Sequence, residues 1–210
     1  MARYDSTTAL IIVDVQNDFA DPAGSLYVAQ GELVVPFVNE QIDAALASGA
    51  RVFYTQDWHP PDTPHFEKDG GIWPVHCVAG TWGAELHPDL LVRGPIVRKG
   101  SQGEDGYSGF SMRHQVTGET LHTELDDLLR QAGVTRLVVA GLATDYCVKA
   151  TALDARERSY PTTLLAAGIR AVDLAPGDGE RAIDEMRAAG VDIVDDARSW
   201  LRNAAAGAGN

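Results

Sequence analysis

Basic residues are scarce in this sequence. Its 210 residues include 17 lysines and arginines against 30 aspartates and glutamates, which gives a formal net charge of −13. Nucleic acids and anionic membrane surfaces bind proteins through clustered lysine and arginine, so this balance argues against both as main partners. The acidic residues are scattered rather than grouped in blocks, a pattern typical of a solubilising surface. We therefore expect neither a nucleic-acid partner nor a membrane partner.

Cysteine and long apolar runs are also rare. The two cysteines, Cys77 and Cys147, are too few for a disulfide framework, which favours a reducing compartment. The apolar run at residues 9–13 follows an acid, is short and ends at Asp14, so it does not resemble a secretory signal. No other run is long enough to cross a membrane. We expect a cytoplasmic protein.

Short apolar runs rich in β-branched residues recur along the chain and alternate with helical patterns. The runs do not alternate with polar residues, which indicates strands buried on both faces. Three helical patterns end at a glycine before the next strand, at Gly49, Gly133 and Gly190. This alternation predicts a three-layer α/β fold with a parallel sheet between two layers of helices. The expected strands are 9–15, 51–57, 95–100, 136–143, 162–168 and 191–196, and the expected helices lie within 34–50, 123–134, 145–159 and 178–191.

The chain length suits one domain, which we expect to cover residues 1–203. Two stretches interrupt the alternation. Residues 58–94 are rich in Pro, Gly, His and Trp, and residues 100–120 are rich in Gly and polar residues. Loops this long inside a compact domain are usually functional or disordered. Because the first contains four of the six histidines, we expect it to be ordered and to carry a site. The tail at 204–210 is expected to be disordered.

Four reactive side chains follow the first four expected strands. Asp14 ends the first, Asp57 the second and Lys99 the third, and Cys147 follows the fourth. In open parallel sheets ligands bind beyond the carboxyl ends of the strands, so these side chains should converge at one edge. Each alone could have an ordinary role as a cap, a solvated lysine or a core cysteine. At the start of a helix the thiolate form of Cys147 would be favoured, as a nucleophile requires.

Asp57 also begins a cluster of potential metal ligands. Asp57 and His59 are two residues apart, so at an extended strand end they point the same way, and His65 and His76 follow in the same loop. One carboxylate and three imidazoles suit a borderline divalent ion, Zn²⁺ in first place and Fe²⁺ or Mn²⁺ as alternatives. The other reading is four independently satisfied side chains. The remaining histidines lack this context and are expected at the surface: His87, His114 and His122.

Five motifs occur in order between about residue 9 and about residue 170: LIIVDVQNDF, TQDWHP…HF, WPVHC, KG…YSGF and GLATDYCVKATALDA. Together they resemble the nicotinamidase (pyrazinamidase) group of the isochorismatase-like cysteine hydrolases. The resemblance implies a six-stranded parallel sheet with helices on both faces, and hydrolysis of nicotinamide to nicotinate and ammonia, with pyrazinamide also accepted. It assigns catalysis to Asp14, Lys99 and Cys147, the metal to Asp57, His59, His65 and His76, the substrate ring to Phe19, Trp73, Tyr107 and Tyr146, and the oxyanion to the backbone N–H groups of Ala143 and Cys147.

The residue types suit amide hydrolysis. A carboxamide is a poor electrophile, so the reaction needs a strong nucleophile, and Asp14 can accept the thiol proton as Cys147 attacks. In this interpretation the metal orients the pyridine ring. In a rival mechanism the metal activates a water molecule. How burial and Lys99 together set the pKa of Asp14 is not readable from the sequence. Cys77 has no matching base and is interpreted as structural.

Two other functions stay open at this point. One is a related cysteine amidase acting on another small amide or an N-carbamoyl compound, and the other is a catalytically silent metal-binding or interaction module. The cluster of one aspartate and three histidines favours a nicotinamidase over the related amidases, and the intact set of Asp14, Lys99 and Cys147 argues against a silent module. The sequence is compatible with a monomer or a homo-oligomer.

Overall fold

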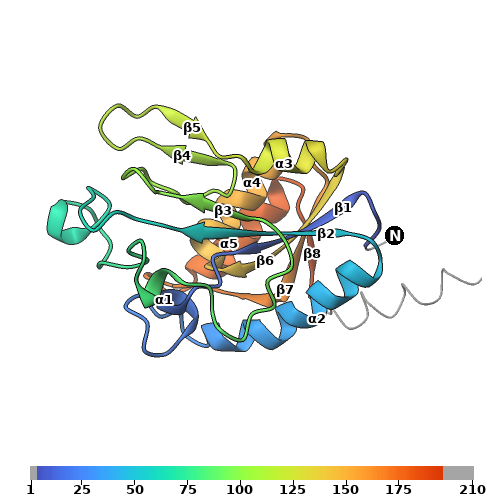
Figure 1. The fold of residues 1–210 in the computed structure, drawn as a ribbon, viewed down its shortest axis with the longest axis horizontal. Coiled ribbons are helices and arrows are strands. Elements are labelled where there is room, and N and C mark those ends of the chain that lie inside the picture. Colours follow the sequence, from blue (N-terminus) through green and yellow to red (C-terminus); the bar gives the residue numbers. More distant parts are fainter. Residues whose placement is uncertain (1–3, 196–210) are drawn as a thin grey trace, which may run out of the picture.

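The computed structural model describes residues 4–195 (Figure 1). Its centre is a six-stranded sheet with the order β3-β2-β1-β6-β7-β8, in which every neighbouring pair is parallel. The three-layer α/β fold and the six strands are therefore confirmed, with ends that differ from the predicted ones by a few residues. The strands are β1 (Thr8–Val13), β2 (Arg51–Asp57), β3 (Ile96–Lys99), β6 (Arg136–Leu142), β7 (Thr162–Arg170) and β8 (Asp192–Val194).

All four predicted helices are present. They are α2 (Val34–Ala47), α3 (Leu125–Gln131), α4 (Lys149–Glu157) and α5 (Asp178–Ala188). Gly49, Gly133 and Gly190 have φ values between 70° and 84°, the left-handed conformation that a C-terminal glycine cap requires. A short helix that was not predicted, α1 (Asn17–Ala20), follows β1. No helix among residues 4–195 is both long enough and apolar enough to span a membrane.

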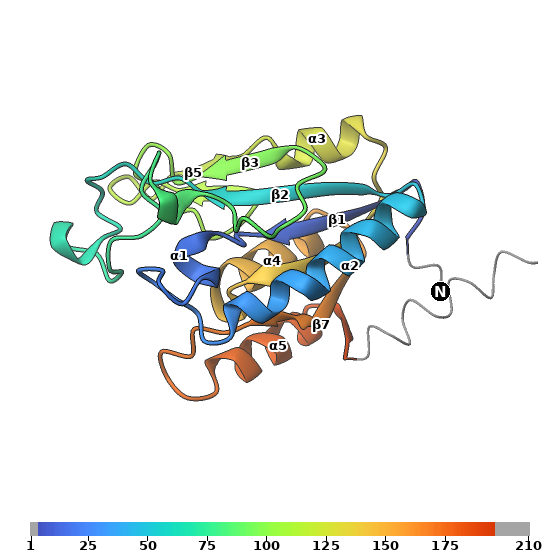
Figure 2. The same ribbon diagram turned by 60° about the horizontal axis from the view of Figure 1, so that its bottom comes forward.

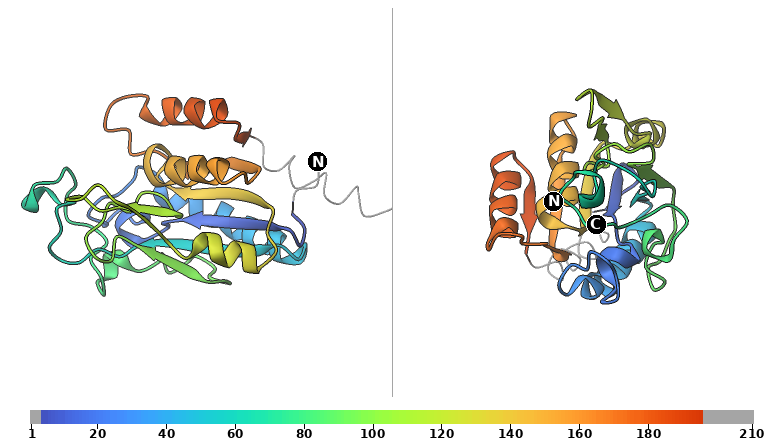
Figure 3. Two further views of the ribbon diagram at one scale, coloured as in Figure 1. Left: turned by 90° about the horizontal axis from the view of Figure 1, so that it is seen from above. Right: turned by 90° about the vertical axis from the view of Figure 1, so that its left-hand side faces the viewer.

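The two faces of the sheet have separate cores. On β1, Leu10 and Ile12 belong to the same buried cluster as side chains of α2, whereas Ile11 and Val13 belong to a second cluster with side chains of α3, α4 and α5. This alternation follows from the pleat of a strand that is buried on both sides. Figure 2 shows α2 running along its face, and Figure 3 shows α4 and α5 side by side.

Two long connections lie beyond the carboxyl ends of the strands, at the left of Figure 1. Residues 58–94 contain only short 3₁₀ turns as helical structure. Trp58 N–H donates to Lys99 O at 2.9 Å and joins the segment to β3, and within the segment His59 N–H donates to Cys77 O at 3.0 Å and Ala79 N–H donates to His59 O at 2.8 Å. Residues 100–123 contain a hairpin that was not predicted, formed by the antiparallel strands β4 (Ser111–Arg113) and β5 (Thr120–His122). The predicted domain end at 203 and the tail at 204–210 lie outside the described residues.

Candidate active site and metal centre

The side chains of Asp14, Lys99 and Cys147 meet beyond the carboxyl ends of β1, β3 and β6. Lys99 Nζ lies 2.7 Å from Asp14 Oδ2 and 3.6 Å from Cys147 Sγ. The same ammonium also contacts Asp57 Oδ1 and the carbonyl of Gly106. Lys99 is fully buried because its side chain lies on the same inward face of β3 as Val97. Its three N–H donors have acceptors in Asp57, Gly106 and Cys147.

Burial and opposing charges together determine the protonation of this group. Burial raises the pKa of Asp14 and the Lys99 ammonium lowers it, and the outcome is a pKa of about 6. Burial would lower the pKa of Lys99, but the carboxylates of Asp14 and Asp57 raise it well above its usual value. Thr55 Oγ1 donates to Asp14 Oδ1 at 2.6 Å. At neutral pH the site therefore holds an ionised Asp14 beside a permanently charged lysine.

Cys147 lies in a π-helical turn, Thr144–Val148, which continues directly into α4. The peptide bond between Leu142 and Ala143, just before this turn, is cis. Burial raises the pKa of the Cys147 thiol well above its usual value, and the carboxylate of Asp14 adds to this effect while Lys99 opposes it. The sequence left the balance of these effects on Cys147 open, and in the structure burial and the neighbouring carboxylates outweigh Lys99 and favour the protonated thiol. The Asp14 carboxylate lies beside this thiol.

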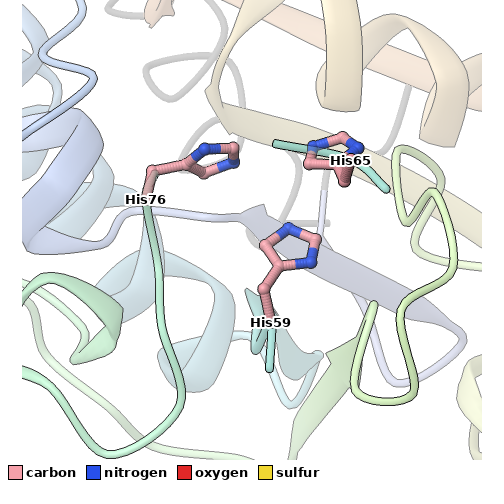
Figure 4. A group of neighbouring side chains, drawn as sticks. All are labelled: His59, His65 and His76. Carbon is pink, nitrogen blue, oxygen red and sulfur yellow. The ribbon is translucent and has the colours of Figure 1, made fainter. Parts of the chain in front are cut away.

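Three buried histidines form a second cluster (Figure 4). Each of His59, His65 and His76 can offer one ring nitrogen such that these atoms lie within 4.8 Å of one another. Figure 4 shows the three rings converging from separate segments of chain. The loop brings them together because the backbone pairing of His59 with residues 77–79 returns His76 to the end of β2.

The hydrogen bonds of these rings fit a bound divalent metal. His65 Nδ1 is 2.6 Å from Asp105 Oδ1 and His76 Nδ1 is 2.8 Å from Pro74 O, so in both rings Nδ1 carries the proton and Nε2 keeps a free lone pair. Neither ring nitrogen of the buried His59 has a hydrogen-bond partner among residues 4–195. Burial lowers the pKa of His76 to about 4, which keeps it neutral at pH 7. Converging imidazoles of this kind are ligands for Zn²⁺ and similar ions.

Asp57 lies between the two clusters. Its Oδ2 is 3.7 Å from His59 Nε2, whereas Oδ1 bonds the Lys99 ammonium. Burial would raise the pKa of Asp57, but Lys99 and His59 hold it well below its usual range. The closest grouping of its carboxylate is with Asp14 and Cys147 rather than with the three histidines. An ionised Asp57 can thus complete a metal site while it anchors Lys99.

One pocket joins the two clusters. Its wall contains the four predicted metal ligands and Cys147, together with the other predicted contact residues, Phe19, Trp73, Tyr107, Ala143 and Tyr146, and also Leu26, Gly106 and Val172. Trp73 Nε1 donates to Tyr107 Oη at 2.8 Å, and the Trp73 and Tyr146 rings meet edge to face at 4.7 Å. Asp14 and Lys99 lie behind Cys147 rather than in the wall. The pocket thus brings aromatic side chains, the histidine cluster and the Cys147 sulfur atom together in one wall.

Two supporting side chains escaped the sequence analysis. The fully buried Gln16 accepts from Asp57 N–H at 2.8 Å and donates to Asp57 O and Ala84 O, both at 2.8 Å, so it fixes the backbone of Asp57. Asp18 accepts from Cys77 N–H at 2.7 Å and thereby holds the residue after His76. Both belong to the QND segment after β1, but their partners lie about 40 to 70 positions away in the chain.

The remaining candidate residues lie outside the pocket wall. Cys77 is a buried free cysteine whose Sγ faces Gly83 O at 3.9 Å. His122 is exposed as expected, whereas His87 and His114 are half-buried and accept hydrogen bonds from nearby backbone N–H groups through Nδ1.

Comparisons with known proteins agree with this geometry. Residues 8–198 match the family model described as the isochorismatase domain. A nicotinamidase of Escherichia coli strain K12 is 38% identical over 204 residues, which cover 88% of this chain and 93% of that protein. Among solved structures, a Pyrococcus horikoshii pyrazinamidase in complex with zinc has a TM-score of 0.79 at 40% identity and covers 90% of this chain and 99% of its own. The PnC1 protein of L. infantum, in complex with nicotinate, has a TM-score of 0.82 at 36% identity and covers 92% and 96%.

Proposed function

This chain belongs to the isochorismatase family, and we propose that it hydrolyses the carboxamide of nicotinamide to nicotinate and ammonia. The observation that carries this proposal is the shared pocket, in which a thiol with an adjacent carboxylate base opens beside three converging histidines. The nicotinamidase of E. coli, the zinc-bound pyrazinamidase and the nicotinate-bound protein support the same substrate class. We propose that pyrazinamide, a ring of similar size with a carboxamide, is accepted as well.

The first half of the reaction uses Asp14 and Cys147. Asp14, ionised at neutral pH, takes the thiol proton while Sγ attacks the amide carbon, which forms a C–S bond and places negative charge on the carbonyl oxygen. The backbone N–H groups of Ala143 and Cys147, both in the pocket wall, are the proposed donors to this oxygen. Asp14 then gives the proton to the nitrogen as the C–N bond breaks, and ammonia leaves.

The second half hydrolyses the thioester. Asp14 takes a proton from a water molecule while the oxygen of that water attacks the acyl carbon. The C–S bond then breaks, and Asp14 returns the proton to the sulfur atom. Lys99 stays charged throughout, because its pKa is raised by the carboxylates of Asp14 and Asp57. Its ammonium stabilises the thiolate as each proton moves and keeps Asp14 oriented toward Sγ.

Substrate orientation is assigned to the pocket wall. Phe19, Trp73, Tyr107 and Tyr146 supply aromatic surfaces for a pyridine ring. A divalent ion held by Asp57, His59, His65 and His76, with Zn²⁺ preferred over Fe²⁺ or Mn²⁺, would supply a Lewis-acidic partner for the ring nitrogen when bound. A ring held in this way would have its carboxamide at Cys147, an orientation effect on the rate.

Two alternatives are less well supported. A related amidase for non-aromatic amides would leave the histidine cluster and the aromatic wall without a role. A mechanism in which a metal-activated water is the nucleophile would leave the pairing of Lys99, Asp14 and Cys147 without one. We also propose a cytoplasmic location, which both free, buried cysteines support.

The test is a comparison of Cys147→Ala with Cys77→Ser. Cys147→Ala should bind zinc and nicotinate like the wild type, because those contacts come from other residues, but should release no ammonia from nicotinamide above background. Asp14→Asn should be nearly as inactive, and the double variant little worse than either, as expected for residues that act as a unit. Cys77→Ser, which removes the other thiol, should keep most activity. Retention of a tenth of wild-type turnover by Cys147→Ala would rule out covalent catalysis.

A further inference from the structure

Three consecutive residues contact three different parts of the site. The Asp105 carboxylate bonds His65 Nδ1 at 2.6 Å, the Gly106 carbonyl accepts from the Lys99 ammonium, and the Tyr107 hydroxyl accepts from Trp73 Nε1 at 2.8 Å. The segment 105–107 therefore links the histidine cluster, the catalytic lysine and the aromatic wall. Displacing it would disturb all three at once.

We propose that Asp105 is a positioning residue that sets the affinity of the metal site by fixing the tautomer and the orientation of His65. An ionised carboxylate only accepts hydrogen bonds, so its contact obliges His65 Nδ1 to carry the proton. Nε2 then keeps the lone pair that a metal needs, and the contact with Asp105 fixes the orientation of the buried ring. The inference rests on the metal site of the proposed function.

The β4–β5 hairpin holds Asp105 in place from outside the pocket. Asp105 N–H donates to Arg113 O and Arg113 N–H donates to Asp105 O, both at 2.9 Å, so the backbone of Asp105 is paired with the end of β4. Gln115 Nε2 also donates to Asp105 Oδ1, the oxygen that bonds His65. Gln115 is not part of the pocket wall and acts on His65 only through Asp105.

The experiment measures zinc affinity by chelator competition and the His65 tautomer by nitrogen-15 NMR of the metal-free protein. Asp105→Asn should weaken zinc binding by about 10- to 100-fold, the range found for partners of metal-bound histidines. It should also shift His65 toward a mixture of tautomers, which general loosening of the fold would not do selectively. Gln115→Ala should move both readouts in the same direction by less. The matched control is Asp62→Asn, which removes the same charge from an exposed position within residues 58–94, the segment that contains the three histidines.

The outcomes separate this inference from the proposed function. If the wild-type protein bound no zinc, the proposed metal site would be wrong, and the tautomer of His65 would still test the role of Asp105. Unchanged zinc affinity and an unchanged tautomer in Asp105→Asn would overturn the inference, even in a fully active nicotinamidase. If Asp105→Asn failed to fold, the zinc affinity and the His65 tautomer of Gln115→Ala would decide the question. Gln115 is half-buried and lies outside the pocket, so this variant should fold.

Discussion

Replacing Lys99 with methionine removes a charge from the interior and leaves the size of the side chain nearly unchanged. In the native site the ammonium is fully buried, lies 2.7 Å from Asp14 Oδ2 and also contacts Asp57. The variant therefore retains two buried carboxylates with oxygens within 4.8 Å of each other and no cation between them. We expect both stability and activity to fall, with a characteristic dependence on pH.

The size of the effect follows from the geometry. Unit charges 2.7 Å apart attract by about 6 kcal/mol at an effective dielectric constant of about 20, an upper bound before desolvation is counted. Loss of one partner from a buried ion pair costs about 3–5 kcal/mol. Asp14, whose pKa burial has already raised to about 6 against the effect of Lys99, would then keep its proton at pH 7. A protonated Asp14 is no base, so kcat/KM at pH 7 should fall by about a thousandfold.

The sign of the pH dependence distinguishes charge from packing. When folding raises the pKa of an acid, the unfolded state releases its proton at a lower pH than the folded state does. The free energy of unfolding therefore falls as pH rises from the unfolded-state pKa to the folded-state pKa. The loss of unfolding free energy in Lys99→Met should therefore grow by up to about 1.4 kcal/mol for each pH unit above 6.

Urea denaturation at pH 6 and pH 8 measures this difference, and ammonia release measures activity. The control is Lys149→Met, in which the same substitution breaks a partly exposed 3.0 Å ion pair with Glu185. It should cost no more than about 1 kcal/mol and keep full activity. Equal losses at pH 6 and pH 8 in Lys99→Met would show that packing rather than charge explains the effect.

Three further predictions concern protonation and the metal site. In the proposed mechanism Asp14 must be ionised to accept the thiol proton, so kcat/KM should fall as pH drops through about 6. At pH 5 it should be about a tenth of its value at high pH. A flat profile with zinc still bound would contradict this. Gly100→Ala would place a Cβ 2.5 Å from the His59 ring at a φ of 73° and should weaken zinc binding, whereas Gly133→Ala, with a φ of 70° and open space around it, should not. His76→Ala should lower both bound zinc and nicotinate affinity while the melting temperature of the metal-free protein changes little; full zinc occupancy would remove His76 from the ligand set.

The sequence predicted the sheet because its four central strands are mostly buried runs with a strong local pattern, whereas the edge strands β3 and β8, expected to be buried on both faces, are partly exposed. It also predicted which residues gather at the site, since parallel strands place their carboxyl ends at one edge. The β4–β5 hairpin escaped prediction because its strands have three residues each and no buried face. The role of Gln16 could not be predicted, because the backbone groups that its amide bonds belong to Asp57, 41 positions away in the chain.

The protonation of the site was likewise beyond local reasoning. Cys147 follows a strand and precedes a helix, which suggests a stabilised thiolate. Its actual state depends on complete burial and on the carboxylates of Asp14 and Asp57, which arrive from other strands. A sum of opposing electrostatic contributions of this kind requires coordinates.

The order of strands in the sheet implies an uneven tolerance to change across the molecule. The reactive residues follow β3, β2, β1 and β6, which are consecutive neighbours, whereas α5 and β8 at the opposite edge contribute no side chain to the pocket wall. Substitutions, fused tags or redesigned surface contacts at the β8 edge should therefore have little effect on turnover. Comparable changes near β3 would lie within a few residues of Lys99 and should lower turnover. One edge of the sheet is free to diversify while the other is constrained by chemistry.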